Sequence, residues 1–176
     1  MPAESLFAIV VLLGLMGYAV VSDLRQHRIP NRLILAGLLL GLAGQTYGAG
    51  LTGLGDAALA VVIGFSIFIP IYALGGMAAG DVKLMAMVGA FLSPGVAIWA
   101  ALYSLIAGGL CGLLLVLARG QAKQTLARCW LMLKVRTYLA PGEDEVAGKP
   151  FPYAVAILIG TLVSLLWLPD SSWTER

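Results

Sequence analysis

Long apolar runs follow one another along nearly the whole 176-residue chain, and this succession most restricts what the chain can fold into. Hydrophobic residues make up 60% of the sequence and charged residues only 11%. Soluble domains carry about a quarter charged residues, so this chain has too few to cover a water-facing surface. We therefore predict an all-α, polytopic membrane protein in contact with the lipid bilayer, because helices satisfy their own backbone groups in lipid.

Turn-forming residues divide the apolar runs into about six predicted membrane-spanning helices. A full crossing takes about 20 residues, or fewer where flanking side chains snorkel or the bilayer thins. The predicted helices are Ser5–Ser22, Leu33–Tyr47, Ala57–Leu74, Val82–Ser93, Val96–Ala118 and Phe151–Leu168. The second and fourth are short for a full crossing. The breaks between them hold glycine and proline, at Pro30-Asn31, Gly48 to Gly55, Gly75-Gly76, Pro94-Gly95 and Pro150.

The basic residues indicate which side of the membrane each connection faces. With six crossings, ten of the 11 Lys and Arg residues fall on one side, and only Arg176 falls on the other. Lys and Arg mark the cytoplasmic side. We therefore expect both termini on the outer side. The connections around Asp23 and Asp81 and the loop 119–150 are expected in the cytoplasm.

The loop 119–150 begins with "RGQAKQTLARCWLMLKVRTYL", which mixes cations with Leu, Trp and Tyr. This composition favours a helix lying in the cytoplasmic membrane interface. The acids Glu143, Asp144 and Glu145 follow in a turn-like stretch and are interpreted as solvated loop charges. We predict one membrane-embedded domain over residues 1–176, with no low-complexity segment or soluble domain.

Two acids, Asp23 and Asp81, each adjoin the end of an apolar helix on the predicted cytoplasmic side. An ionisable group at that depth is costly and is a candidate functional residue. Either acid alone is explained as well by a helix cap or by hydrated headgroups. Their placement on one side, where helix packing can bring them together, favours a shared function.

Small residues surround the second acid: Gly75, Gly76, Ala78, Ala79 and Gly80 precede Asp81. Such a backbone can accept an extended peptide as an added strand through main-chain hydrogen bonds. Close helix packing through small residues is the other interpretation, and both can hold.

Three stretches resemble motifs of the type IV prepilin peptidases, in the family's order. "SDLRQHRIPNRL" resembles the first aspartate motif, an Asp followed shortly by Ile-Pro-Asn. "MAAGDVKLMAMVGAF" resembles the second, the GxGD motif, with Ala78 in place of its first glycine, so that the turn must use ordinary dihedrals there. "KPFPYAVAI" resembles the proline-aromatic-alanine segment that opens the last helix.

The resemblance implies a membrane aspartic endopeptidase of the bacterial inner membrane, acting at its cytoplasmic face. It implies removal of the basic leader from prepilin or pseudopilin precursors, after a leader glycine, with Asp23 and Asp81 as the catalytic pair. No metal, other cofactor or nucleic acid is expected, and contact with a pilus assembly machinery is possible. The chain lacks the cysteine tetrads of larger members, so no methyltransferase domain is expected. It is similar to the short, peptidase-only form of tight-adherence (Flp) pilus systems.

Two neighbouring carboxylates suit amide hydrolysis, because repulsion lets the pair hold one proton over a wide pH range. The charged member then takes a proton from water, and the protonated member polarises the scissile carbonyl. Asp81 opens a helix, where the helix dipole favours a carboxylate, and Asp23 follows a helix end, where it does not. We therefore expect Asp81 to be the base and Asp23 the acid.

Other residues receive lesser roles. Lys83 is expected on a different helix face from Asp81, reaching toward headgroups. Pro30 and Asn31 are expected to start the second helix, and His27 is interpreted as a solvated loop residue. Pro152 and Tyr153 are interpreted either as neighbours of the aspartate pair or as core packing.

Three rival functions remain open at this point. A small proton-coupled transporter also explains acids in a membrane but predicts them near the bilayer middle. A structural subunit of a pilus or secretion machine predicts that both acids are dispensable. A presenilin-like peptidase shares GxGD, but its first aspartate follows Tyr, whereas Ser22 precedes Asp23 here.

Overall fold

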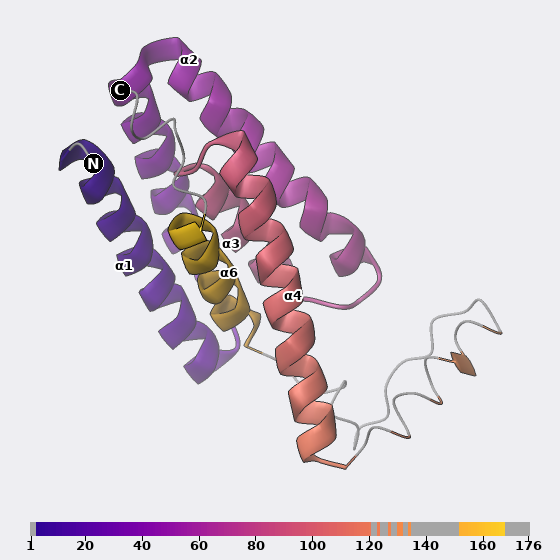
Figure 1. Cartoon of the computed structure of the whole chain (residues 1–176). Coiled ribbons are helices and arrows are strands. Elements are labelled where there is room, and N and C mark those ends of the chain that lie inside the picture. Colours follow the sequence, from indigo (N-terminus) through magenta and orange to yellow (C-terminus); the bar gives the residue numbers. More distant parts are fainter. Residues whose placement is uncertain are drawn as a thin grey trace.

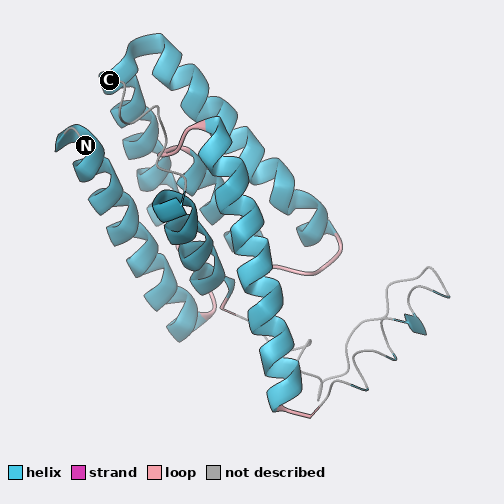
Figure 2. Ribbon diagram, in the orientation of Figure 1, coloured by secondary structure: helices cyan, strands magenta, loops and turns pink. Residues whose placement is uncertain are grey.

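The computed structural model describes residues 3–120 and 152–167, together with residues 123, 127, 130, 131 and 134. Within these residues every regular element is a helix, as predicted (Figures 1 and 2). The helices are α1 (Ala3–Gln26), α2 (Asn31–Ala73), α3 (Ala79–Gly89), α4 (Pro94–Ala118) and α6 (Tyr153–Trp167).

Helix α2 consists of two arms that meet at Gly50, where φ is 63° and ψ is −143°. Side chains rarely allow this region, so glycine is needed for the bend. A Cβ atom on Gly53 would collide with the carbonyl oxygen of Gln45, which shows how tightly the arms reverse. The chain turns back there in Figure 1. The break predicted at Gly48 to Gly55 is thus confirmed at Gly50, but the other residues of that stretch are helical, so one element replaces two predicted helices.

Helix α3 packs between the two arms of α2. A Cβ atom on Gly41, in the first arm, would lie 2.8 Å from Ala90 Cβ, and one on Gly64, in the second arm, would lie 2.8 Å from the Met85 carbonyl oxygen. These glycines let the backbones approach closely. Apart from exposed Lys83, the residues from Asp81 to Leu92 are buried.

The predicted helix Val82–Ser93 is wrong at both ends. Helix α3 begins at Ala79 and ends at Gly89, and residues 90–92 turn toward α4. Its 11 residues extend about 17 Å, roughly half of the hydrocarbon thickness. The apolar pattern did not show the end of this helix, because the residues of the following turn are as apolar and as buried as the helix.

The remaining boundaries differ less. Helix α1 continues past the predicted end at Ser22 to Gln26. Helix α4 begins at Pro94, before the predicted Val96, and ends at Ala118 as predicted, and α6 lies within the predicted range. Most of the predicted interfacial helix lies outside the described residues. The residues described there are helical, and Lys134 Nζ lies 4.9 Å from the centroid of the Trp130 ring.

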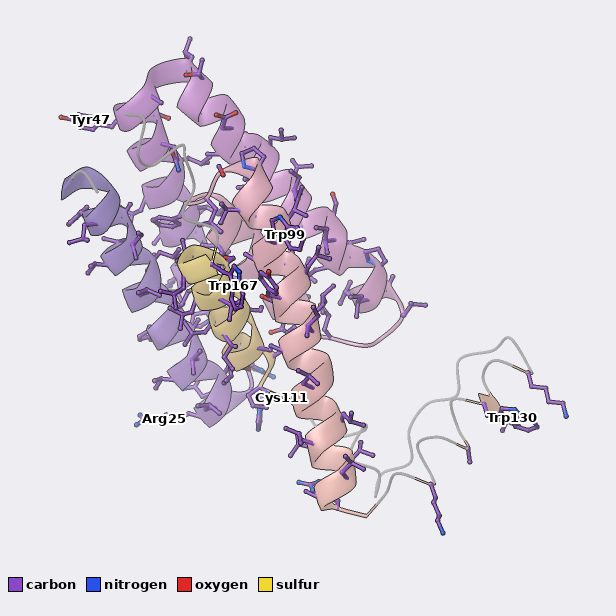
Figure 3. The ribbon with its side chains drawn as sticks, viewed as in Figure 1. Arg25, Tyr47, Trp99, Cys111, Trp130 and Trp167 are labelled. Atoms are coloured by element: carbon purple, nitrogen blue, oxygen red, sulfur yellow. The ribbon has the colours of Figure 1, made fainter. Side chains whose placement is uncertain are left out.

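Large apolar side chains cover the outside of the helices (Figure 3), among them Leu39, Val62 and Leu114, each more than half exposed. Among the described residues, α2, α4 and the α1 segment Leu6–Gln26 are long and apolar enough to cross a membrane, and α6 is a shorter apolar helix. Exposed apolar surface of this extent suits lipid, so the chain is a helical membrane protein. Six crossings and the outward termini stay predictions.

Successive helices alternate in direction in Figure 1. The α1–α2 connection, the α2–α3 connection and the start of α6 therefore lie toward one end of the bundle. The bend at Gly50 and the α3–α4 connection lie toward the other end. This arrangement brings the three stretches that resemble family motifs to the same end of the bundle.

Candidate active site

Asp23 lies in the last turn of α1, and its side chain is only 6% exposed. The helix ends at Gln26, and the next residue, His27, has φ 49° and an amide that donates to the Asp23 carbonyl oxygen at 2.8 Å. Asp23 Oδ2 accepts a hydrogen bond from the Ala154 amide at 3.2 Å. This amide belongs to the first turn of α6, where helix amides have no partner within the helix. Asp23 therefore caps a helix that is far away in the sequence.

Asp81 is the third residue of α3, and its side chain is 4% exposed. Its Oδ2 accepts a hydrogen bond from the Ala78 amide at 3.1 Å, so it caps its own helix. Ala78 has φ −82° and ψ 153°, an ordinary extended conformation. The ordinary dihedrals predicted for alanine in place of the motif's first glycine are thus present.

The charges of the two carboxyl groups interact electrostatically. Among the described residues, each accepts a side-chain hydrogen bond through Oδ2 only, which leaves Oδ1 of each to other partners. Both are buried, so repulsion between two negative charges is screened weakly by water. The structure thus brings together the two acids that the sequence singled out.

The connection between α1 and α2 lies against the start of α3. Ser22 Oγ donates to the Arg28 carbonyl oxygen at 2.8 Å, which fixes the turn. Ile29 then lies over Gly80, where an added Cβ atom would be 3.6 Å from Ile29 Cβ. Pro30 is the N-cap of α2, and its carbonyl oxygen accepts from the Leu33 amide at 3.0 Å, so the predicted start of this helix is confirmed.

A hydrogen bond between two exposed side chains also joins these segments. Lys83 Nζ donates to Asn31 Oδ1 at 3.1 Å. Lys83 is exposed and Asp81 is buried, so they lie on different faces of α3, as predicted.

The glycine-rich stretch before Asp81 is less extended than the strand-addition hypothesis requires. Gly75 closes α2 with φ 75°, and α3 already begins at Ala79. Leu74 to Ala78 lie between the two helices, and Ala79 and Gly80 are already helical, so these two residues present no extended backbone edge. A Cβ atom on Gly76 would lie 2.9 Å from Ile71 Cγ2, so this position needs a small residue.

Tyr153 begins α6 beside the aspartate pair. Its ring meets Phe68 edge-on, with centroids 6.1 Å apart, and its hydroxyl donates to the Ser104 carbonyl oxygen at 3.3 Å. It also interacts electrostatically with Asp81. The Pro152 carbonyl oxygen accepts from the Val155 amide at 3.3 Å within the first turn. The interpretation of Tyr153 as a neighbour of the pair is thus supported, and it packs in the core as well.

Sequence reasoning missed the Ala154 amide, since a backbone donor has no residue signature. The start of the last predicted helix was the only available signal. This contact also bears on the predicted roles of base for Asp81 and acid for Asp23. That prediction considered, for each aspartate, only the dipole of its own helix. Asp23 ends α1 but faces the first turn of α6, so both carboxyl groups meet the favourable end of a helix dipole. The dipole therefore gives no reason to separate their roles.

Comparison with known proteins identifies a family. Residues 10–113 match the type IV leader peptidase family, a range that includes both aspartates and more than half of the chain. No curated protein and no solved structure matched at the level required. The match over residues 10–113 extends from α1 into α4 and includes the two segments that meet at the aspartate pair. The chain belongs to the type IV leader peptidase family.

Proposed function

We propose that this chain is an aspartic endopeptidase that removes the basic leader from prepilin-like precursors, with Asp23 and Asp81 as its catalytic residues. One observation carries the proposal. Two carboxyl groups from separate motifs are almost fully buried, interact electrostatically and are each held by one backbone amide. Membership of a peptidase family gives this arrangement its chemistry.

The reaction consumes one water molecule and one peptide bond. The ionised carboxylate takes a proton from water, whose oxygen adds to the scissile carbonyl carbon, while the protonated carboxyl donates to the carbonyl oxygen. The resulting diol collapses: one of its hydroxyl groups returns a proton to the ionised carboxylate, the carbon–nitrogen bond breaks and the new amine takes a proton from the protonated carboxyl. The products are a carboxylic acid and an amine, and the pair again holds one proton. Amide hydrogen bonds to Oδ2 keep both side chains in position between these steps.

The location follows from charge. Arg25, Arg28, Arg32 and Lys83 surround the connections that carry the pair, and basic residues favour the cytoplasmic side. The proposed site is therefore at the cytoplasmic face of the bacterial inner membrane, where a precursor exposes its leader. The precursor's own hydrophobic helix remains in the bilayer beside the apolar exterior of the bundle.

The other predicted site residues shape the surroundings. Gly76, Ala78, Ala79 and Gly80 keep the approach to Asp81 free of large side chains. Pro30, Asn31 and Lys83 join the α1–α2 connection to α3. We propose that Flp-type pilins or other pseudopilins are the substrates, and that the enzyme supplies a pilus assembly or secretion machinery.

The test is co-expression with a candidate precursor, in which loss of the leader is scored by gel shift and the new amino terminus by mass spectrometry. Asp23→Asn and Asp81→Asn should each abolish processing, since neither amide can exchange the proton. Asp56→Asn is the matched control, because Asp56 is an exposed acid of α2 far from the pair in sequence. Processing at the wild-type rate by either variant of the pair would refute the two-aspartate mechanism.

A further inference from the structure

We propose that Tyr153 is a positioning residue for the aspartate pair. It holds the first turn of α6 in a position from which the Ala154 amide donates to Asp23. This inference deepens the proposed function and uses it for the kinetic test. A second readout, described below, does not depend on catalysis.

The Tyr153 ring is fixed by two other helices. Phe68 of α2 is fully buried and meets the ring edge-on, and the Ser104 carbonyl oxygen of α4 accepts from the hydroxyl. Gly108 of α4 also lies against the ring, since a Cβ atom there would collide with the tip of the ring. Contacts with α2 and α4 therefore hold the ring in its position.

The position of the Tyr153 ring determines the direction of the next amide in the chain, that of Ala154. Ala154 is fully buried, and its N–H donates to Asp23 Oδ2 at 3.2 Å. A planar peptide bond joins the two residues, so a shift of Tyr153 redirects this N–H. A backbone hydrogen bond to a carboxylate favours its ionised form. Loss of the bond therefore makes Asp23 harder to ionise.

Several charged or titratable groups face this contact. Asp23 interacts with His27 at the end of its own helix and with Asp81 of α3, and Tyr153 interacts with Asp81 and with Cys111 of α4. The ester and Gly108→Ala, whose effect on titration is tested below, change none of these side chains. A change in titration then reports the contact with α6.

Four variants separate positioning from folding. Tyr153→Phe keeps the ring and loses the hydrogen bond to Ser104. Gly108→Ala displaces the ring from its position. Gly109→Ala is the matched control, because a Cβ atom on this neighbouring glycine meets nothing within 4 Å. Replacement of the Tyr153–Ala154 amide by an ester, with lactic acid incorporated at position 154, deletes the N–H donor and keeps every side chain.

We expect Tyr153→Phe to lower kcat about fivefold with KM unchanged, the effect of one ordinary hydrogen bond. The ester and Gly108→Ala should move the acid limb of the pH–rate profile upward by roughly one to two pH units, because hydrogen bonds to charged groups are stronger. Gly109→Ala should leave the profile unchanged.

The readout that is independent of catalysis is the infrared band of the protonated Asp23 carboxyl. It is isolated as the difference between Asp81→Asn protein and the Asp23→Asn/Asp81→Asn double variant, each in the full chain in detergent. Its titration midpoint should rise with the ester and with Gly108→Ala. An unchanged midpoint in both would overturn the positioning role, even if precursors are cleaved. A raised midpoint in the Asp81→Asn background, together with wild-type protein that cleaves no precursor, would support the positioning role and refute the proposed function instead.

Discussion

Asp23 and Asp81 are held by the same kind of contact: one carboxyl oxygen of each accepts a hydrogen bond from a backbone amide at the start of a helix. Asp81 obtains its donor three residues away, within its own motif, whereas Asp23 obtains it from α6. The first contact is a feature of local sequence and the second depends on the whole fold. A change in the α6 contact should therefore affect Asp23 before it affects Asp81.

The electrostatic interaction between the two carboxyl groups leads to a prediction about pH. Interacting acids lose their protons in two separated steps, and only the singly protonated pair holds both a base and an acid. The rate of precursor cleavage should therefore fall on both sides of an optimum. At low pH the base becomes protonated, and at high pH the acid loses its proton.

The measurement is kcat/KM for a leader peptide substrate as a function of pH in detergent-solubilised protein. Intrinsic fluorescence at each pH serves as the control for unfolding. A rate that rises to a plateau at high pH would contradict the shared proton, because it would require a base alone.

At the scale of elements, the position of α3 depends on glycines of α2. Gly41 and Gly64 leave no space for a side chain between the arms and α3. Without this close approach, Asp81 would move away from α1. The short length of α3 and the bend at Gly50 are parts of the same arrangement, in which a helix of about half a membrane thickness is enclosed by a helical hairpin.

This packing predicts opposite effects for two glycines in the second arm of α2. A Cβ atom on Gly64 would lie 2.8 Å from the Met85 carbonyl oxygen, whereas one on Gly55 meets nothing within 4 Å. Gly64→Ala should destabilise the protein by about 1–3 kcal/mol through overpacking. Gly55→Ala should be neutral or stabilise it by up to about 1 kcal/mol, because alanine favours helix.

Thermal unfolding in detergent, followed by circular dichroism, compares the two variants with the wild type. The close-packing interpretation of α3 would be wrong if both variants unfolded at the same temperature. Precursor cleavage should decline with Gly64→Ala and not with Gly55→Ala.

Sequence patterns predicted which segments form helices better than they predicted where each helix begins and ends. Prolines at 30 and 94 mark the starts of α2 and α4, since proline ends one element and suits the first turn of the next. The end of α3 was not predictable, because buried Phe91 and Leu92 follow it in an irregular turn. The pair itself was predictable from Asp23 and Asp81. The hydrogen bond from the Ala154 amide and the position of the Tyr153 ring were not, because they depend on contacts between distant parts of the chain.

At the scale of the whole molecule, the alternating helices place the aspartate pair and the Gly50 bend toward opposite ends. Basic residues predict that the pair faces the cytoplasm, so the bend should face outward. Two exposed positions report the two sides: Gln26 at the end of α1 and Thr52 just after the bend.

In a variant with Cys111 and Cys129 replaced by Ser, we expect Thr52→Cys to react with a membrane-impermeant maleimide in spheroplasts. Gln26→Cys should react only after the membrane is permeabilised. Processing of the precursor by each labelled variant confirms that the fold is intact. The reverse pattern of labelling would place the pair outside and contradict the proposed location.

The donor to Asp23 comes from the last of the described helices, and this has a consequence for biosynthesis. A ribosome delivers both aspartates to the membrane long before α6 is made, but a nascent chain at that stage has no partner for one of them. Under the proposed function, proteolytic competence should therefore arise late, after the final helix has inserted and docked. A half-synthesised chain should then cleave no membrane protein near the translocation site.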